Sequence, residues 1–269
     1  MLAMTLPILF AIFIWWFSTG LILLLDGLPR TTFRWSLVIS SALALAAFSG
    51  LLHTADQTDV ASAYCAFTCA LLIWGWHELS FLTGWITGPR KIGSPPGASE
   101  GERFGHAVHA ILWHELAIIG VGLLLLAVTW NQPNQIGTWT FLVLWIMRTS
   151  SKLNLFLGVR NFSEEFLPPH LAYLQTFFRR RPMNLLFPFS VTAATGVAWL
   201  MVLAALRAEP AAAAGLMLVT TMLSLAIVEH WLLVLPFPAS ALWRWAMRSP
   251  NPSPSPAVTK TDEKLLHAR

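Results

Sequence analysis

The chain has 269 residues, of which 56% are hydrophobic and only 11% are charged. A soluble domain usually carries about 25% charged residues, so this composition leaves too little polar surface for a water-exposed fold. The net charge of +4 comes from basic residues gathered in a few loops, which favours membrane topology over nucleic-acid binding. We therefore expect the lipid bilayer, and not nucleic acid, as the surroundings of this chain.

Apolar residues fall in seven blocks of about 20 residues, the length that crosses a hydrocarbon core of roughly 30 Å. In lipid every backbone polar group must be satisfied within its own element, and the blocks do not alternate as barrel strands do. The sequence thus predicts an all-α transmembrane bundle over 1–248. Its predicted spans are 4–25, 34–52, 60–86, 104–130, 136–157, 184–206 and 213–236.

Basic and non-basic loops alternate along the whole chain. The loops after the first, third and fifth predicted spans carry Lys and Arg, as does the C-terminal tail. By the positive-inside rule the N-terminus lies in the periplasm and the C-terminus in the cytoplasm, so we expect a multi-pass protein of a bacterial inner membrane. The tail, 249–269, is rich in Ser and Pro and is expected to be disordered in the cytoplasm.

Three pairs of adjacent His and Glu lie inside predicted spans, where ionisable groups are costly and suggest function. They are His77–Glu78, His114–Glu115 and Glu229–His230. At a helical rise of 1.5 Å per residue, they lie about 10–15 Å from the cytoplasmic ends of their spans, which is compatible with one shared polar layer.

A carboxylate in hydrocarbon must be protonated, paired with a cation or bound to a metal. Three interpretations of this layer stay open. The layer can be a polar network that joins helices, or a site at which a neutral His ligates a tetrapyrrole. It can also be a metal site. Di-iron bundles space their ligands as Glu-x-x-His, unlike the adjacent pairs here, which makes iron the lesser candidate. The metal-ligand candidates are Glu78, Glu115, Glu229 and His230.

The densest polar stretch runs from Arg148 to Asn184. Pro168 and Pro169 must interrupt any helix, and 170–181 is expected to form a short surface helix with a basic end. That basic end can contact lipid phosphates, although membrane topology alone would also explain its arginines. We predict that 158–183 is a cytoplasmic loop that binds a partner. The candidate residues of this interaction segment are Arg148, Lys152, Asn154, Asn161, Glu165, His170 and Asn184.

Several motifs of this stretch and of the third and fourth spans resemble one family. They are Arg-Thr-Ser-Ser-Lys-Leu-Asn-Leu-Phe-Leu-Gly-Val from Arg148, Asn161, Glu165-Phe-Leu-Pro, His170-Leu-x-Tyr-Leu, Pro182-Met-Asn, Trp76-His77-Glu78, Thr87-Gly-Pro-Arg and His114-Glu115. The chain resembles the PuhE type of photosynthetic complex assembly protein over nearly its whole length except the tail. The resemblance implies bacteriochlorophyll-based phototrophic bacteria, a gene near that of the reaction-centre H subunit, and a role in assembly and bacteriochlorophyll supply. It brings no catalytic residues.

The first hypothesis is a non-catalytic assembly factor that binds bacteriochlorophyll, a precursor, or nascent subunits through the polar layer and the 158–183 segment. Its partners would be photosynthetic complex subunits or proteins of the bacteriochlorophyll pathway. The second is a membrane metalloenzyme of tetrapyrrole metabolism that uses the same His and Glu residues as ligands. The third is a transporter of pigment precursors or protons, which the scarcity of ionisable residues in the outer half of the bundle disfavours.

Overall fold

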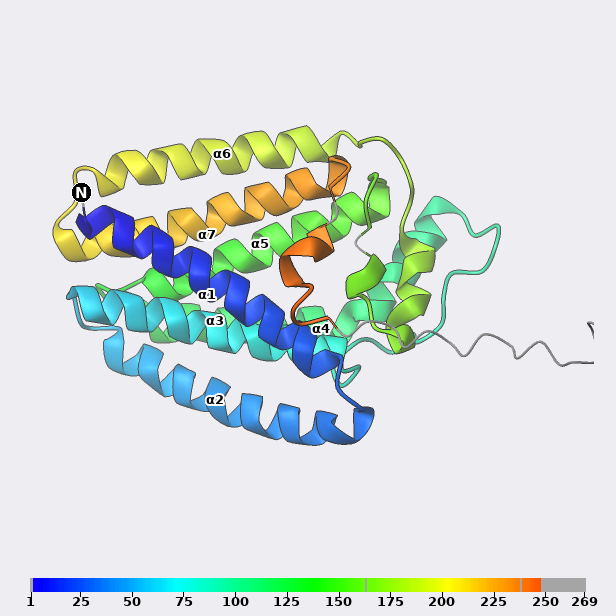
Figure 1. Cartoon of the computed structure of the whole chain (residues 1–269), viewed down its shortest axis with the longest axis horizontal. Coiled ribbons are helices and arrows are strands. Elements are labelled where there is room, and N and C mark those ends of the chain that lie inside the picture. The colour runs from blue at the N-terminus through cyan, green and yellow to red at the C-terminus, as the bar shows by residue number, and fades with distance from the viewer. Residues whose placement is uncertain (1, 163, 238, 248–269) are drawn as a thin grey trace, which may run out of the picture.

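The computed structural model describes the chain except residues 1, 163, 238 and 248–269, so the predicted tail lies outside the described residues. The long helices of the described part lie side by side in one bundle, with the longer loops gathered at one end (Figure 1). The helices are α1 (Leu2–Asp26), α2 (Phe33–Thr54), α3 (Val60–Leu82), α4 (Glu100–Val128), α5 (Ile136–Leu157), α6 (Leu186–Ala205) and α7 (Pro210–Val234). Within the described residues there is no strand, which confirms the all-α class.

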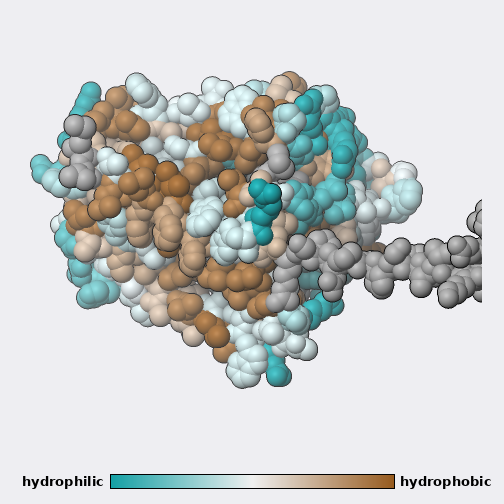
Figure 2. Space-filling view, in the orientation of Figure 1, coloured by the Kyte–Doolittle hydropathy of each residue, from teal (hydrophilic) through white to brown (hydrophobic). Residues whose placement is uncertain are grey.

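Six of these helices are long and apolar enough to cross a membrane: α1, α2, α3, α4, α6 and α7. Large apolar side chains such as Leu45, Phe189 and Leu200 are exposed on their outer faces. Figure 2 shows apolar surface over the bundle and hydrophilic surface at the loop end. Such a surface suits contact with a bilayer. The α5 helix falls outside this set and carries Arg148 and Lys152, so seven spans and the orientation of the termini stay predictions.

Two predicted boundaries differ from the structure by four residues. The third predicted span continues to residue 86, but α3 ends at Leu82, because Gly84 adopts a φ of +78° and lets Trp85 N–H turn back to the Ser80 carbonyl. The fourth predicted span begins at 104, but α4 begins at Glu100. Ser99 and Glu102 form a capping box there, which satisfies the first free N–H groups of the helix.

The expected surface helix in the loop after α5 is a 3₁₀ helix, η3 (Pro169–Phe177), and not an α-helix. Its buried residues are Leu171, Leu174 and Phe177, at intervals of three. A 3₁₀ helix has 3.0 residues per turn, so this spacing puts all three side chains on one face. That face packs against Phe81 and Leu82 of α3 and Ala110 of α4, and it therefore fixes the loop to the end of the bundle.

Gly88 lies against the backbone of α4. A Cβ atom at this position would lie 2.0 Å from the His109 carbonyl oxygen and 2.5 Å from the carbonyl carbon of Ala110. The neighbouring Thr87 carbonyl accepts a hydrogen bond of 2.9 Å from the backbone N–H of His114, so the loop after α3 is bonded to α4 at this point.

We expect Gly88→Ala to destabilise the protein by about 1–3 kcal/mol, because overpacking against backbone cannot be relieved by a side-chain rotation. The matched control is Gly105→Ala on α4, whose Cβ would meet nothing within 4 Å. It should be neutral or stabilising by up to about 1 kcal/mol. The measurement is the thermal unfolding of both variants in detergent. Equal melting temperatures for Gly88→Ala and wild type would refute the close approach.

Candidate functional site

Helix α5 carries two cations one turn apart, and each reaches a carboxylate of another helix. Arg148 Nη2 lies 3.0 Å from Glu78 Oε2 on α3, and Lys152 Nζ lies 2.5 Å from Glu115 Oε1 on α4. Residues at i and i+4 share one face of a helix, so this face of α5 supplies the positive charge for both neighbours. The two cations thereby join three helices.

Glu229 of α7 belongs to the same group of charges. Its Oε1 accepts a hydrogen bond of 3.0 Å from the indole N–H of Trp15 on α1. Arg148 is close enough for its charge to attract Glu229 and Glu115 as well as Glu78. We name these five residues the charge cluster. Its members are Glu78, Glu115, Arg148, Lys152 and Glu229.

The three histidines of the predicted layer are buried in helix packing, and none of them is ion-paired or hydrogen-bonded to a described residue of the charge cluster. His77 and His114 are buried, their ring centroids are 6.4 Å apart, and His114 also lies against the ring of Phe81. Adjacent residues on a helix point about 100° apart, so each Glu can join the charge cluster while its neighbouring His packs elsewhere.

His230 is buried and hydrogen-bonded at both ring nitrogens. Its Nδ1 lies 2.9 Å from the Ala226 carbonyl oxygen, and its Nε2 lies 2.9 Å from the Ser150 hydroxyl. A carbonyl can only accept, so Nδ1 carries the proton. Ser150 also lies 2.9 Å from the hydroxyl of Ser190, which links α5, α6 and α7. His230 therefore helps to hold these three helices together beside the charge cluster.

The charge cluster is enclosed at one end and open at the other. The Glu78 side chain is 13% exposed, and those of Lys152 and Glu115 are each 22% exposed. Arg148, by contrast, is 43% exposed, and Glu229 is also exposed. Glu229 lies five residues before the end of α7, about 8 Å along the helix axis. The open end is therefore a charged patch within the apolar part of the bundle.

Two carboxylates of the cluster, Glu78 and Glu115, are paired with cations, and the third, Glu229, is held by the indole of Trp15. Among the described residues, no group of three or more His, Cys, Asp or Glu side chains comes together in a way that could hold a metal ion. The arrangement can bind a polar or charged group at its open end, where Arg148 offers N–H donors and Glu229 offers acceptors.

Arg148 and Lys152 of the predicted interaction segment belong to the charge cluster, and its other residues divide into two sets. The first set joins helix ends. Asn184 Nδ2 donates to Asn154 Oδ1 at 3.0 Å and to the Gly158 carbonyl at 2.9 Å, and its Oδ1 accepts from the backbone N–H of Leu186 at 2.9 Å. Asn161 Nδ2 donates to the carbonyl of Leu232 at 2.9 Å. These asparagines tie the loop to α5, α6 and α7.

The second set lies nearer the surface. His170 Nε2 donates to the Leu82 carbonyl at 2.7 Å, and burial lowers the pKa of this imidazole, helped by the charge of Arg30. Glu165 is exposed and forms no ion pair with the described residues. Two of the three arginines expected to meet lipid phosphates are engaged within the protein, since Arg179 pairs with Glu100 and Arg180 pairs with Glu164.

Three residues of this site were absent from the sequence-based candidates. Ser150 and Ser190 are polar residues too short to stand out in an apolar helix, and only the fold brings them to His230. Trp15, by contrast, could have been identified from its position in the sequence. It lies in the middle of the first apolar block, whereas Trp in membrane proteins is enriched near the interfaces.

The fold and the site define a class of protein: a multi-pass helical membrane protein with a charge cluster shared by α1, α3, α4, α5 and α7. The particular family follows from sequence comparison. The chain belongs to DUF3623, described as a protein of unknown function, whose family model matches residues 1–253. A relative from Rhodobacter capsulatus, an uncharacterized 30.4 kDa protein in the puhA 5′ region, is 41% identical over 239 residues and covers 86% of each chain. No solved structure matches the chain.

Proposed function

We propose that this protein is an integral factor for assembly of the bacterial photosynthetic apparatus. It would span the inner, intracytoplasmic membrane seven times, with α5 as a charged span inside the bundle and the C-terminus in the cytoplasm. Two observations support the process. One is the position of the relative's gene in the puhA 5′ region, and the other is the resemblance of the motifs to the PuhE type of assembly protein.

The single observation that carries the proposed role is the open end of the charge cluster. An exposed Arg and Glu at membrane depth are costly in contact with lipid tails. A bound group that meets Arg148 and Glu229 would remove that cost. We infer that the open end receives a pigment, bacteriochlorophyll or a precursor, or a polar residue of a nascent subunit. The metalloenzyme and transporter hypotheses draw no comparable support from the described residues.

The test is deletion of the gene in a phototrophic bacterium, followed by complementation with single variants. Glu229→Gln keeps the size of the side chain and removes its charge. The matched control is Glu209→Gln, an exposed residue at the other end of α7 with no side-chain cap bond. We expect wild type and Glu209→Gln to restore the near-infrared absorption of assembled complexes, and Glu229→Gln to restore less than half of it at equal protein level. Full restoration by Glu229→Gln would refute the role of the open end.

A further inference from the structure

A small cationic pocket lies at the loop end of the bundle, apart from the charge cluster. It has a volume of about 260 Å³, and it opens between the end of α3, the turn before α2 and η3. Its polar and charged lining includes Arg30, Thr87, Lys91, His170 and Tyr173. The lining contains no carboxylate, and neither Arg30 nor Lys91 forms an ion pair with any described residue.

The pocket also offers neutral hydrogen-bonding groups. The Tyr173 hydroxyl is buried beside the Thr87 side chain, without a hydrogen bond of good geometry. A buried hydroxyl normally finds a partner, so this one is a donor available to a ligand. Two unpaired cations and a free hydroxyl form a set of donors suited to an oxyanion.

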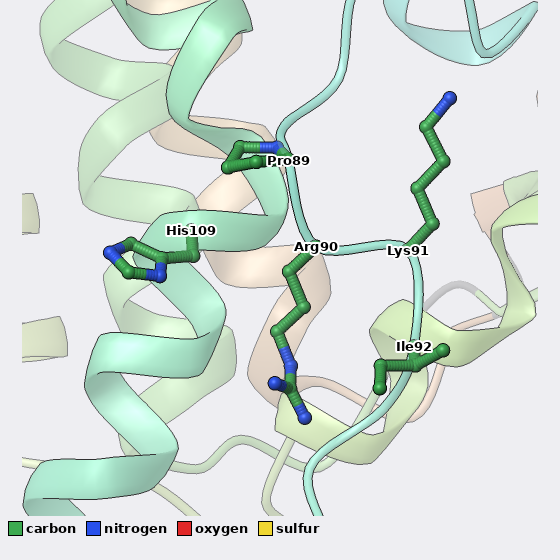
Figure 3. Close-up of a pocket in the computed structure, with 5 residues that line it drawn as sticks. All are labelled: Pro89, Arg90, Lys91, Ile92 and His109. Carbon is green, nitrogen blue, oxygen red and sulfur yellow. The ribbon is translucent and has the colours of Figure 1, made fainter.

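The neighbouring hollow is larger, but its basic side chains do not converge on one point. It has a volume of about 430 Å³ and is lined by Pro89, Arg90, Lys91, Ile92 and His109. Figure 3 shows that Arg90 and Lys91 point in different directions and that His109 lies on the far side of Pro89. Arg90 is also engaged, since its Nη2 donates to the Gly93 carbonyl at 2.6 Å. Of the two, only the smaller pocket has two unpaired cations and a buried tyrosine hydroxyl in its lining.

Size and position indicate the ligand. Pockets for drug-sized molecules usually have about 300–1,000 Å³, so 260 Å³ suits a headgroup and not a whole pigment. The pocket adjoins helix ends, and the exposed Trp35 and Trp85 lie near it in the chain, as is typical of a membrane–water interface. We propose that this pocket binds the phosphate of an anionic phospholipid headgroup. This inference does not depend on the proposed function.

The experiment is lipid binding by the delipidated full chain in neutral detergent, measured by calorimetry. Dioctanoyl phosphatidylglycerol should bind, and it should bind at least tenfold more weakly to Arg30→Gln/Lys91→Gln, since each basic residue contributes electrostatic attraction to anionic lipid. Tyr173→Phe should weaken binding by a smaller factor. The matched control is Arg34→Gln, an exposed cation in the first turn of α2 that does not line the pocket, and it should bind as wild type does.

Three outcomes would overturn the proposal. Equal affinity of wild type and Arg30→Gln/Lys91→Gln, with both proteins folded by circular dichroism, would show that the pocket is not the site. Inorganic phosphate that binds as tightly as the lipid, with the same loss in the double variant, would assign the pocket to a free phosphate and refute the lipid headgroup. Equal affinity for zwitterionic dioctanoyl phosphatidylcholine would refute recognition of an anionic lipid.

Discussion

Lys152→Met should destabilise the bundle by about 2–4 kcal/mol. Breaking a buried ion pair costs about 3–5 kcal/mol, and we lower that figure because both side chains are 22% exposed. Methionine preserves most of the volume of the lysine, so the loss comes from Glu115, which is left charged between helices without its cation. The measurement is the free energy of unfolding in mixed micelles with increasing denaturing detergent.

The control for this result is the double variant Lys152→Met/Glu115→Gln. It removes both charges, and it should recover at least half of the lost free energy because no uncompensated carboxylate remains. If the single variant is as stable as wild type, the ion pair makes no contribution and the structure of the charge cluster is wrong at this point. If the double variant is less stable than the single one, Glu115 has a more important partner than Lys152.

Asn184→Leu should also cost about 2–4 kcal/mol. The substitution removes the donor to the buried Asn154 and to the Gly158 carbonyl, and it removes the acceptor that caps the first N–H groups of α6. Unsatisfied buried groups cost more than the hydrogen bonds themselves contribute. The measurement is again the free energy of unfolding, together with protease accessibility of the loop after α5.

Two further variants separate the causes. Asn184→Ser keeps an acceptor for the cap but loses the reach to Gly158, so its loss should be about half that of the leucine variant. Met183→Leu changes the exposed neighbour and should stay within about 0.5 kcal/mol of wild type. If Met183→Leu lowers the free energy of unfolding as much as Asn184→Leu does, any substitution in this loop segment destabilises the protein, and the asparagine network is not the cause.

Much of the helical layout could be predicted because membrane spans are set by length and hydropathy. The predicted span 136–157 coincides with α5, although its charges place this helix outside the apolar set. The ends of α3 and α4 were missed because they depend on local backbone geometry. At Gly84 and Ser99 a positive φ and a capping box decide where the helix ends or begins.

The pairing within the site could not be predicted for a physical reason. A helix in lipid is apolar on all sides, so the sequence alone does not say which face meets which neighbour. Arg148 and Lys152 were assigned to the cytoplasmic segment, where basic side chains extend toward water. In the structure they turn inward to Glu78 and Glu115, so these two residues of the interaction segment belong with the carboxylates of the polar layer.

The most direct test of the central claim is the content of the protein purified in mild detergent from a pigment-producing phototrophic host. The absorption spectrum and mass spectrometry of wild type and Glu229→Gln are compared, with metal analysis of both. We predict that bacteriochlorophyll, a precursor, or photosynthetic complex subunits accompany the wild type and fall at least fivefold in Glu229→Gln. Equal amounts in both proteins, or one equivalent of a transition metal that is lost in Glu115→Gln, would contradict the account.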